Sequence, residues 1–316
     1  MKGVPEEAVD IVTASITKST TKQYESALSP WFKYCNLNKL NCYKPTRSSI
    51  LSFLTQKFNE GSSYGTLNSA RSAISLISGE KIGEDDTICR FLKGVSKLRP
   101  PRPKYEYTWD VNIVLKYLEK LYPLDDLTLK DLTFKTVMLL VLSTAHRAQT
   151  IANIKVENIK GTDAGLLIHI TDQIKTSAPG RYQPLLSLPF FEENPKLCVA
   201  SSVLKYIERT KDLRASFDKL FIAFRKPHND VCAQSISRWI KSILGESGID
   251  TSIFTAHSTR HASTSRAFTS GVDIDTIRRT AGWSKESQTF ARFYNREIVT
   301  SDNNKFALAI LSKNKN

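Results

Sequence analysis

The stretch HSTRHASTSRAFTSGVDIDTIRRTAGWSKESQTFARFY contains the residues of this chain whose types and spacing could support chemistry. His257 and Arg260 are three residues apart, so on a helix they can face one ligand. A guanidinium can hold a phosphate through two parallel hydrogen bonds, and Tyr294 closes the stretch with a phenol. The combination suggests a site that binds a phosphate and attacks it. The alternative is a capped helix whose histidine and arginine simply face solvent.

This stretch needs a helix that begins next to the two polar residues. We predict one that runs to about Ser270 and ends at Gly271, with Ser258 or Thr259 as its N-cap. Free backbone N–H groups and the helix dipole favour an anion at such an N-terminus. The predicted helix therefore adds to the attraction of the arginine for a phosphate.

The composition points to a folded protein with a polyanionic partner. The chain has 316 residues, enough for two domains, and Lys plus Arg outnumber Asp plus Glu by 45 to 31. A net charge of +14 favours nucleic acid as the partner. The five cysteines form no CxxC pair, and no apolar run could span a membrane. We expect reduced thiols, an intracellular location, no metal, no membrane and no small-molecule substrate.

The first part of the chain predicts a helical domain over residues 18–98, after a lead-in at residues 1–17. Apolar residues recur at helical spacing, and Trp31 and Phe32 are expected in the core. We predict helices from about residue 19, with Thr20 or Thr21 as cap, from Thr46, over 63–77 and over 86–97.

Residues 99–108 predict a stiff linker, because three prolines stand among basic residues in LRPPRPKYEYTWD. Arg99, Arg102 and Lys104 could cross a DNA backbone there. A simple spacer is the alternative reading of the same segment.

Residues 109–316 predict a second domain of mixed character. Asp110 should cap a helix that runs to about Leu121, and Arg147 should stand where a short helix begins. Residues 165–190 alternate in parts and predict an antiparallel hairpin with Lys175 near its tip. Further helices are expected over 129–142, 197–210, 233–244 and 305–311, and residues 221–224 fit either a short strand or a buried turn.

The ordered set of polar residues resembles the tyrosine recombinase (phage-integrase-like) family. That family has an Arg, a hairpin Lys, His-x-x-Arg, His or Trp, and then Tyr. The matching residues here are Arg147, Lys175, His257, Arg260, Trp283 and Tyr294. The segments TWDV, HSTRHAS and GWSKESQTFARFYNREI look most like recombinases of eukaryotic Crypton and DIRS mobile elements. The resemblance implies a mainly α fold: a helical core-binding domain and an α+β catalytic domain with a small antiparallel sheet, together forming a clamp around DNA.

The family's chemistry would give Tyr294 the role of nucleophile. Its phenol would attack a DNA phosphodiester, form a 3′-phosphotyrosine and release a 5′-hydroxyl. Arg147 and Arg260 would stabilise the charge that develops on the phosphate oxygens. The energy of the bond would stay in the covalent link, so the resemblance implies neither a cofactor nor a metal.

The remaining matches imply proton transfer and packing. Lys175 would protonate the leaving oxygen, although Lys155, Lys160 and Arg181 lie nearby in sequence. His257 would help to move the tyrosine proton, and the HxxR spacing selects it over His261. Trp283 replaces the commoner His and would pack against the site, where its indole N–H could reach the phosphate.

The resemblance implies a site-specific recombinase or integrase that acts on double-stranded DNA as a homo-tetramer, for the integration or excision of a mobile element. A eukaryotic source would imply a nuclear location. Two alternatives stay open: a domesticated, non-catalytic DNA-binding protein that keeps the fold, and a type IB topoisomerase with the same chemistry.

Overall fold

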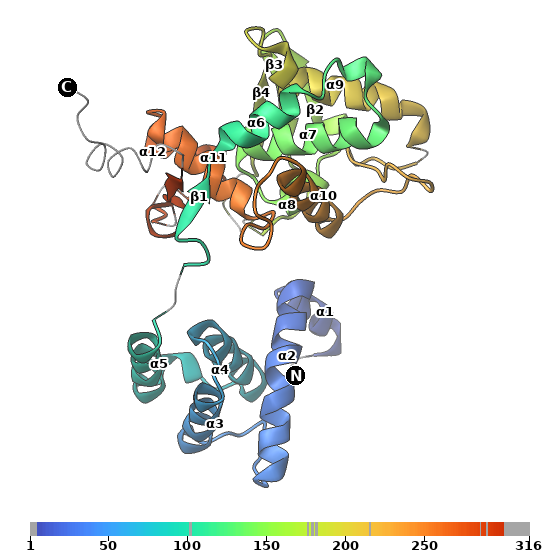
Figure 1. Ribbon diagram of the computed structural model, residues 1–316. Helices are drawn as coiled ribbons and strands as arrows, with labels where there is room; N and C mark the ends of the chain where they lie inside the picture. Colours follow the sequence, from blue (N-terminus) through green and yellow to red (C-terminus); the bar gives the residue numbers. More distant parts are fainter. Residues whose placement is uncertain are drawn as a thin grey trace, which may run out of the picture. The chain divides into compact units, whose positions relative to one another are not determined.

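The computed structural model describes residues 5–100, 103–175, 177, 180, 183–214, 216–284, 286–288 and 290–299. The chain separates into two compact units, unit 1 up to Arg102 and unit 2 from Pro103 onward (Figure 1). Each unit has its own hydrophobic core. The helix expected over residues 305–311 lies outside the described residues.

Unit 1 is helical, and polar caps set most of its helix starts. Thr46 forms a capping box with Ser49 at one helix, and Asp85 accepts the N–H groups of Thr87 and Ile88 at another. The expected cap at Thr20 or Thr21 is wrong, because Thr17 accepts the Thr20 N–H one turn earlier. The elements are α1 (Glu6–Ala14), α2 (Lys18–Leu37), α3 (Arg47–Asn59), α4 (Tyr64–Ser78) and α5 (Asp86–Leu98).

The core of unit 1 forms around Trp31, which is fully buried. Its ring meets Phe53 edge-on at 5.2 Å, and its indole N–H donates to the Cys42 carbonyl at 3.1 Å. Trp31 is therefore a core residue, as predicted. Phe32 is not, because it is 38% exposed and pairs with Tyr43 near the surface. α1 occupies the expected lead-in and buries none of its residues.

Unit 2 packs its helices around α7 (Leu129–Thr144), which is buried over most of its length. The Asp110 cap of α6 is confirmed, since its carboxylate accepts the Asn112 N–H. The other helices are α6 (Val111–Glu119), α8 (Ala148–Ala152), α9 (Val199–Thr210), α10 (Ala233–Glu246), α11 (Ser258–Thr269), α12 (Ile274–Thr280) and the π-helical turn η6 (Phe290–Tyr294).

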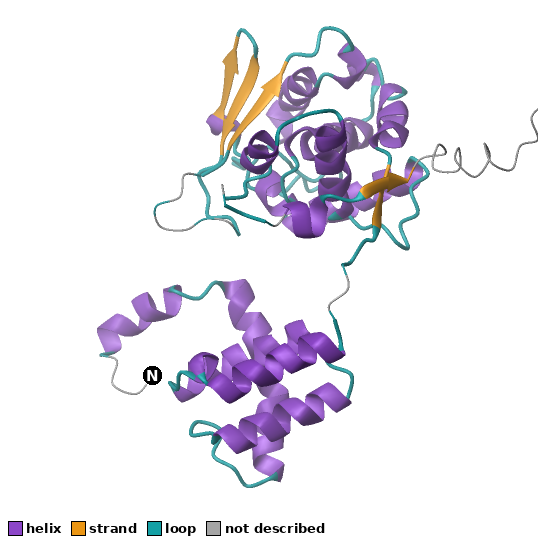
Figure 2. Ribbon diagram, turned by 90° about the vertical axis from the view of Figure 1, so that its left-hand side faces the viewer, coloured by secondary structure: helices purple, strands orange, loops and turns teal. Residues whose placement is uncertain are grey.

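Two small sheets lie on opposite sides of the helices of unit 2 (Figure 2). One is antiparallel, in the order β2 (Ile159–Thr162), β3 (Gly165–His169) and β4 (Leu185–Pro189). This confirms the predicted hairpin, as β3 and β4, and adds β2. The other pairs β1 (Tyr107–Trp109) with β5 (Glu297–Val299) in parallel. Phe221 is buried, and the neighbouring Ile222 forms an isolated bridge with Asp230.

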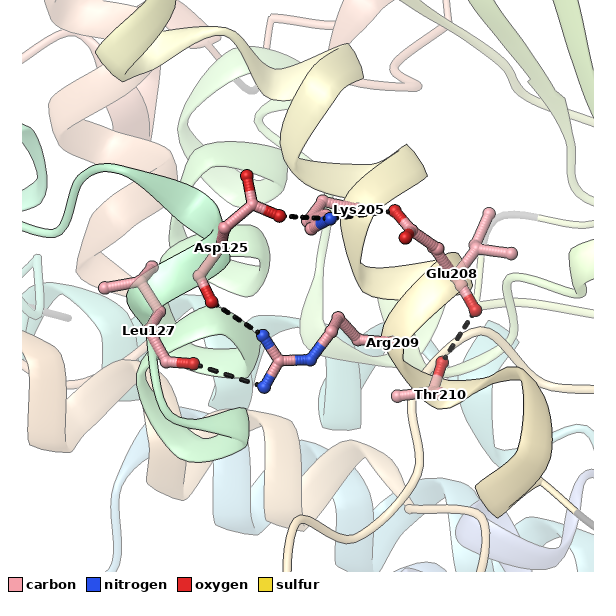
Figure 3. Close-up of polar contacts among 7 residues, drawn as sticks. Asp125, Leu127, Lys205, Glu208, Arg209 and Thr210 are labelled. Atoms are coloured by element: carbon pink, nitrogen blue, oxygen red, sulfur yellow. Dashed lines mark hydrogen bonds and ion pairs between the residues drawn. The ribbon is translucent and has the colours of Figure 1, made fainter.

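Polar contacts from α9 hold the segment that leads into α7 (Figure 3). Lys205 forms ion pairs with Asp125 and Glu208. Arg209 donates to the backbone carbonyls of Asp125 at 3.1 Å and Leu127 at 3.4 Å. These contacts fix the entry to α7, and the far end of α7 leads directly to Arg147.

Candidate active site

The first turn of α11 carries two of the predicted site residues, but it is not capped as expected. Ser258 Oγ donates to the Thr255 carbonyl at 2.8 Å and accepts the indole N–H of Trp109 at 2.9 Å. Thr259 Oγ1 donates to the Ala256 carbonyl at 2.8 Å. Both hydroxyls therefore bind the preceding turn, and the cap prediction is wrong. His257 occupies the N-cap position with no side-chain cap.

Arg260 connects two segments that are distant in sequence. Its side chain is 1% exposed and donates from Nη1 to the Ala145 carbonyl at 2.5 Å and from Nη2 to the Ala281 carbonyl at 2.7 Å. The guanidinium carbon also lies 4.5 Å from the ring centroid of Trp283. Burial, and then the charge of Arg147, lower the pKa of Arg260 to about 10. The guanidinium thus stays charged at neutral pH and holds together the ends of α7 and α12.

Tyr294 is buried, and its hydroxyl lies 3.1 Å from Nε2 of His257. Burial, and then the charges of Arg260 and Arg147, lower the pKa of His257 to about 4. The imidazole is therefore neutral at physiological pH. A neutral imidazole at this distance can accept the phenolic proton.

The backbone on both sides of Tyr294 is held in unit 2. Ser265 Oγ donates to the Tyr294 carbonyl at 2.9 Å and accepts the N–H of Arg296 at 3.0 Å. Phe290, at the start of η6, is buried. Immediately beyond, β5 pairs with β1, so the nucleophile candidate lies on a segment fixed at several points.

Trp283 packs against Tyr294, with 4.8 Å between the ring centroids, as the resemblance implied. Its indole Nε1 is buried and has no hydrogen-bond partner among the described residues. The preceding Gly282 has φ +66°, and a Cβ there would lie 3.1 Å from Cε1 of His146. No sequence pattern predicted this role for His146, which is 5% exposed and fills the space beside the glycine.

Arg147 and Lys175 approach the same site from separate segments. Arg147 is half-buried at the N-cap of α8, three residues after the end of α7. Lys175 is exposed in the loop between β3 and β4, and its backbone N–H donates to Oε1 of Gln149 on α8 at 3.2 Å. The charges of both residues help to lower the pKa of His257, after the larger effects of burial and Arg260.

The described basic residues of the expected linker bind to different parts of the protein. Arg99 donates to the carbonyls of Phe58 at 3.2 Å and Ser62 at 2.7 Å, and its guanidinium lies 4.2 Å from the Phe58 ring. Arg99 is thus bound to the end of α3. Lys104 is exposed and donates to Thr255 Oγ1 at 3.3 Å. Arg102 lies outside the described residues.

Two absences concern the part of the chain that the structure describes. No three His, Cys, Asp or Glu side chains there gather into a group that could hold a metal ion. None of the helices there has the length and apolar character required to cross a membrane.

The sequence of residues 113–298 matches the Phage integrase family. The chain belongs to this family. The match covers most of unit 2, from α6 to β5, and includes all six predicted site residues. No curated protein matches the sequence.

Solved structures show the fold of this phage integrase family member. XerH recombinase bound to palindromic difH substrate matches with a TM-score of 0.62 and 15% identity, over 92% of this chain and 80% of that chain. A lambda integrase dimer bound to a COC′ core site matches with a TM-score of 0.57 and 15% identity, over 90% of this chain and 91% of that chain. The Tn1549 transposon integrase in complex with transposon right end DNA matches with a TM-score of 0.55 and 16% identity, over 84% of this chain and 85% of that chain. The fold is therefore that of the tyrosine recombinases: mainly helical, with a small antiparallel sheet.

Proposed function

We propose that this phage integrase family member cuts and rejoins double-stranded DNA through a covalent bond between Tyr294 and a 3′ phosphate. The observation that carries the proposal is the 3.1 Å contact between the Tyr294 hydroxyl and His257, next to the buried guanidinium of Arg260. A phenol, a proton acceptor and a fixed positive charge are the parts that attack on a phosphodiester requires.

The first step would form a bond between Tyr294 Oη and phosphorus and break the bond between phosphorus and the 5′ oxygen. Neutral His257 would accept the phenolic proton, and Lys175 would give a proton to the leaving oxygen. Arg147 and Arg260 would stabilise the non-bridging oxygens in the five-coordinate transition state. The reverse reaction with another 5′-hydroxyl would rejoin the strand.

The substrate and assembly belong to the same proposal. Related structures hold a core site, a difH substrate and a transposon end, and one of them is a dimer on DNA. By analogy, we expect the two units of this chain to clamp duplex DNA and to work as a homo-tetramer on paired sites, for the integration or excision of a mobile element of the Crypton or DIRS kind. The net charge of +14 predicts binding that weakens steeply with salt. Such a role would place the protein with DNA inside the cell, in the nucleus of a eukaryote.

The test is covalent trapping on a DNA site that is first selected from a random pool by binding. A nicked suicide duplex of that site should give a covalent adduct with the wild-type protein and none with Tyr294→Phe. Tyr34→Phe, in unit 1, is the matched control and should form the adduct at the wild-type rate. An adduct that survives Tyr294→Phe would refute the assigned nucleophile. Tight binding without any adduct on the selected site would favour a non-catalytic DNA-binding protein.

A further inference from the structure

His261 lies one helical turn after His257 on α11, against the ring of the proposed nucleophile. It is 5% exposed, and its imidazole stacks on the Tyr294 ring with 4.3 Å between centroids and 25° between planes. His257 contacts Tyr294 differently, through the hydroxyl and at a tilted ring angle of 48°. Two histidines of one helix thus contact the tyrosine at its oxygen and at its face.

The imidazole of His261 is itself held by an aromatic contact. Tyr105 meets it edge-on, with 5.0 Å between centroids and 80° between planes. The Tyr105 hydroxyl is fixed in turn by Thr255 Oγ1 at 2.7 Å. His261 is therefore packed between Tyr105 and Tyr294, and a shift of its ring would need a shift of both.

One nitrogen of the His261 imidazole, Nδ1, is buried and has no hydrogen-bond partner among the described residues, whereas the ring has close contacts on two sides. Burial, and then the neighbouring groups His257, Arg296, Arg260 and Lys104, lower the pKa of His261 to about 3. The imidazole is neutral when the site works, which suits a stacking contact and not an ion pair with the phenolate.

We propose that His261 is a positioning residue whose ring holds Tyr294 with its hydroxyl at His257. The proposal rests on the function proposed above, since the held orientation matters for attack on a phosphate. A tyrosine whose ring is already fixed needs no further ordering before it reacts, and fixed geometry of this kind accelerates attack. The ring surface carries the effect, so another aromatic ring should replace the imidazole.

The discriminating pair of variants is His261→Phe and His261→Leu. Phenylalanine keeps a flat ring, whereas leucine fills similar space without one. On the suicide duplex in a single turnover, we expect His261→Leu to form the adduct about 10- to 100-fold more slowly than wild type. His261→Phe should stay within about threefold of wild type, and both should bind DNA with unchanged affinity because the residue faces the protein interior. His261→Met serves in the same comparison if the leucine variant does not fold.

A second measurement tests how accessible the Tyr294 ring is, and it needs no reaction with DNA. Tetranitromethane nitrates accessible tyrosines, and peptide mass spectrometry assigns the product to Tyr294. Nitration should be slow in wild type and in His261→Phe, and about tenfold faster in His261→Leu, if stacking holds the ring.

The outcomes separate the two proposals. If the wild-type protein forms no adduct, the proposed function fails, and the nitration rates still decide whether His261 holds the ring. Equal losses of rate in His261→Phe and His261→Leu would show that a nitrogen atom acts, and would overturn the stacking role. Unchanged adduct and nitration rates in His261→Leu would overturn it as well.

Discussion

Replacement of Gly282 by alanine should disturb the site through His146. Gly282 has φ +66°, a left-handed conformation that side chains disfavour, and an added Cβ would lie 3.1 Å from Cε1 of His146. The imidazole cannot withdraw easily, because His146 is 5% exposed. The strain should therefore move the Gly282 backbone and, with it, the adjoining Trp283.

The destabilisation has two contributions, the positive φ of the backbone and the contact with His146, and a matched glycine separates them. Gly271 in the same unit has φ +86° and no heavy atom within 4 Å of an added Cβ. Gly271→Ala should therefore show the backbone cost alone, about 1–2 kcal/mol. Gly282→Ala should add an overpacking cost of about 1–3 kcal/mol, for a total of about 2–5 kcal/mol.

Urea unfolding of the whole chain, followed by circular dichroism, measures these differences in the free energy of unfolding. A double-mutant cycle with His146→Ala should return the overpacking part, because the smaller side chain leaves room for the new Cβ. Equal destabilisation by Gly282→Ala and Gly271→Ala, with no coupling to His146, would refute the reasoning.

Two further predictions concern buried ionisable side chains, His146 and Arg260. Burial, with the charges of Arg260 and Arg147, lowers the pKa of His146 to about 3 from its usual 6.5, so the unfolded chain takes up a proton first as the pH falls. His146 alone should thus lower the stability by up to about 1.4 kcal/mol per pH unit below pH ~6.5, and the buried His257 and His261 should add to the drop in the same direction. Melting temperatures between pH 7.5 and 4.5 should show this drop, reduced in His146→Gln, and a flat wild-type profile would contradict it. Arg260→Lys should leave the carbonyl of Ala145 or Ala281 without a donor, at a cost of about 1–3 kcal/mol in urea unfolding. The same variant should slow adduct formation by about 10²- to 10³-fold, and a wild-type rate would show that the reaction does not need a guanidinium at this position.

Local signals in the sequence predicted most of the helices. A cap at Thr46 or Asp110 is a short-range feature, because side chain and backbone lie within three residues of each other. β1 and β5 were missed because each has three residues, and they pair across most of unit 2. A strand of that length has too few positions to show alternation.

The site was predicted as a set of residues, but not as a set of contacts. Residue order identified Arg260 and Tyr294, whereas only the fold shows that Arg260 binds the carbonyls at the ends of α7 and α12. The cap prediction at Ser258 failed for a similar reason, since Trp109, distant in sequence, donates to its hydroxyl. His146 and His261 act through packing, and a lone sequence carries no periodic signal for such contacts.

The pairing of β5 with β1 limits how far the tyrosine can travel. Only Asn295 and Arg296 separate Tyr294 from the strand, and three extended residue steps span about 10 Å at most. While the β1–β5 ladder stays intact, the Tyr294 phenol stays close to β1 of its own chain. Under the proposed function, a DNA end joined to Tyr294 would therefore stay close to β1 of the chain that cut it. The DNA itself would have to move for that end to reach a new 5′-hydroxyl.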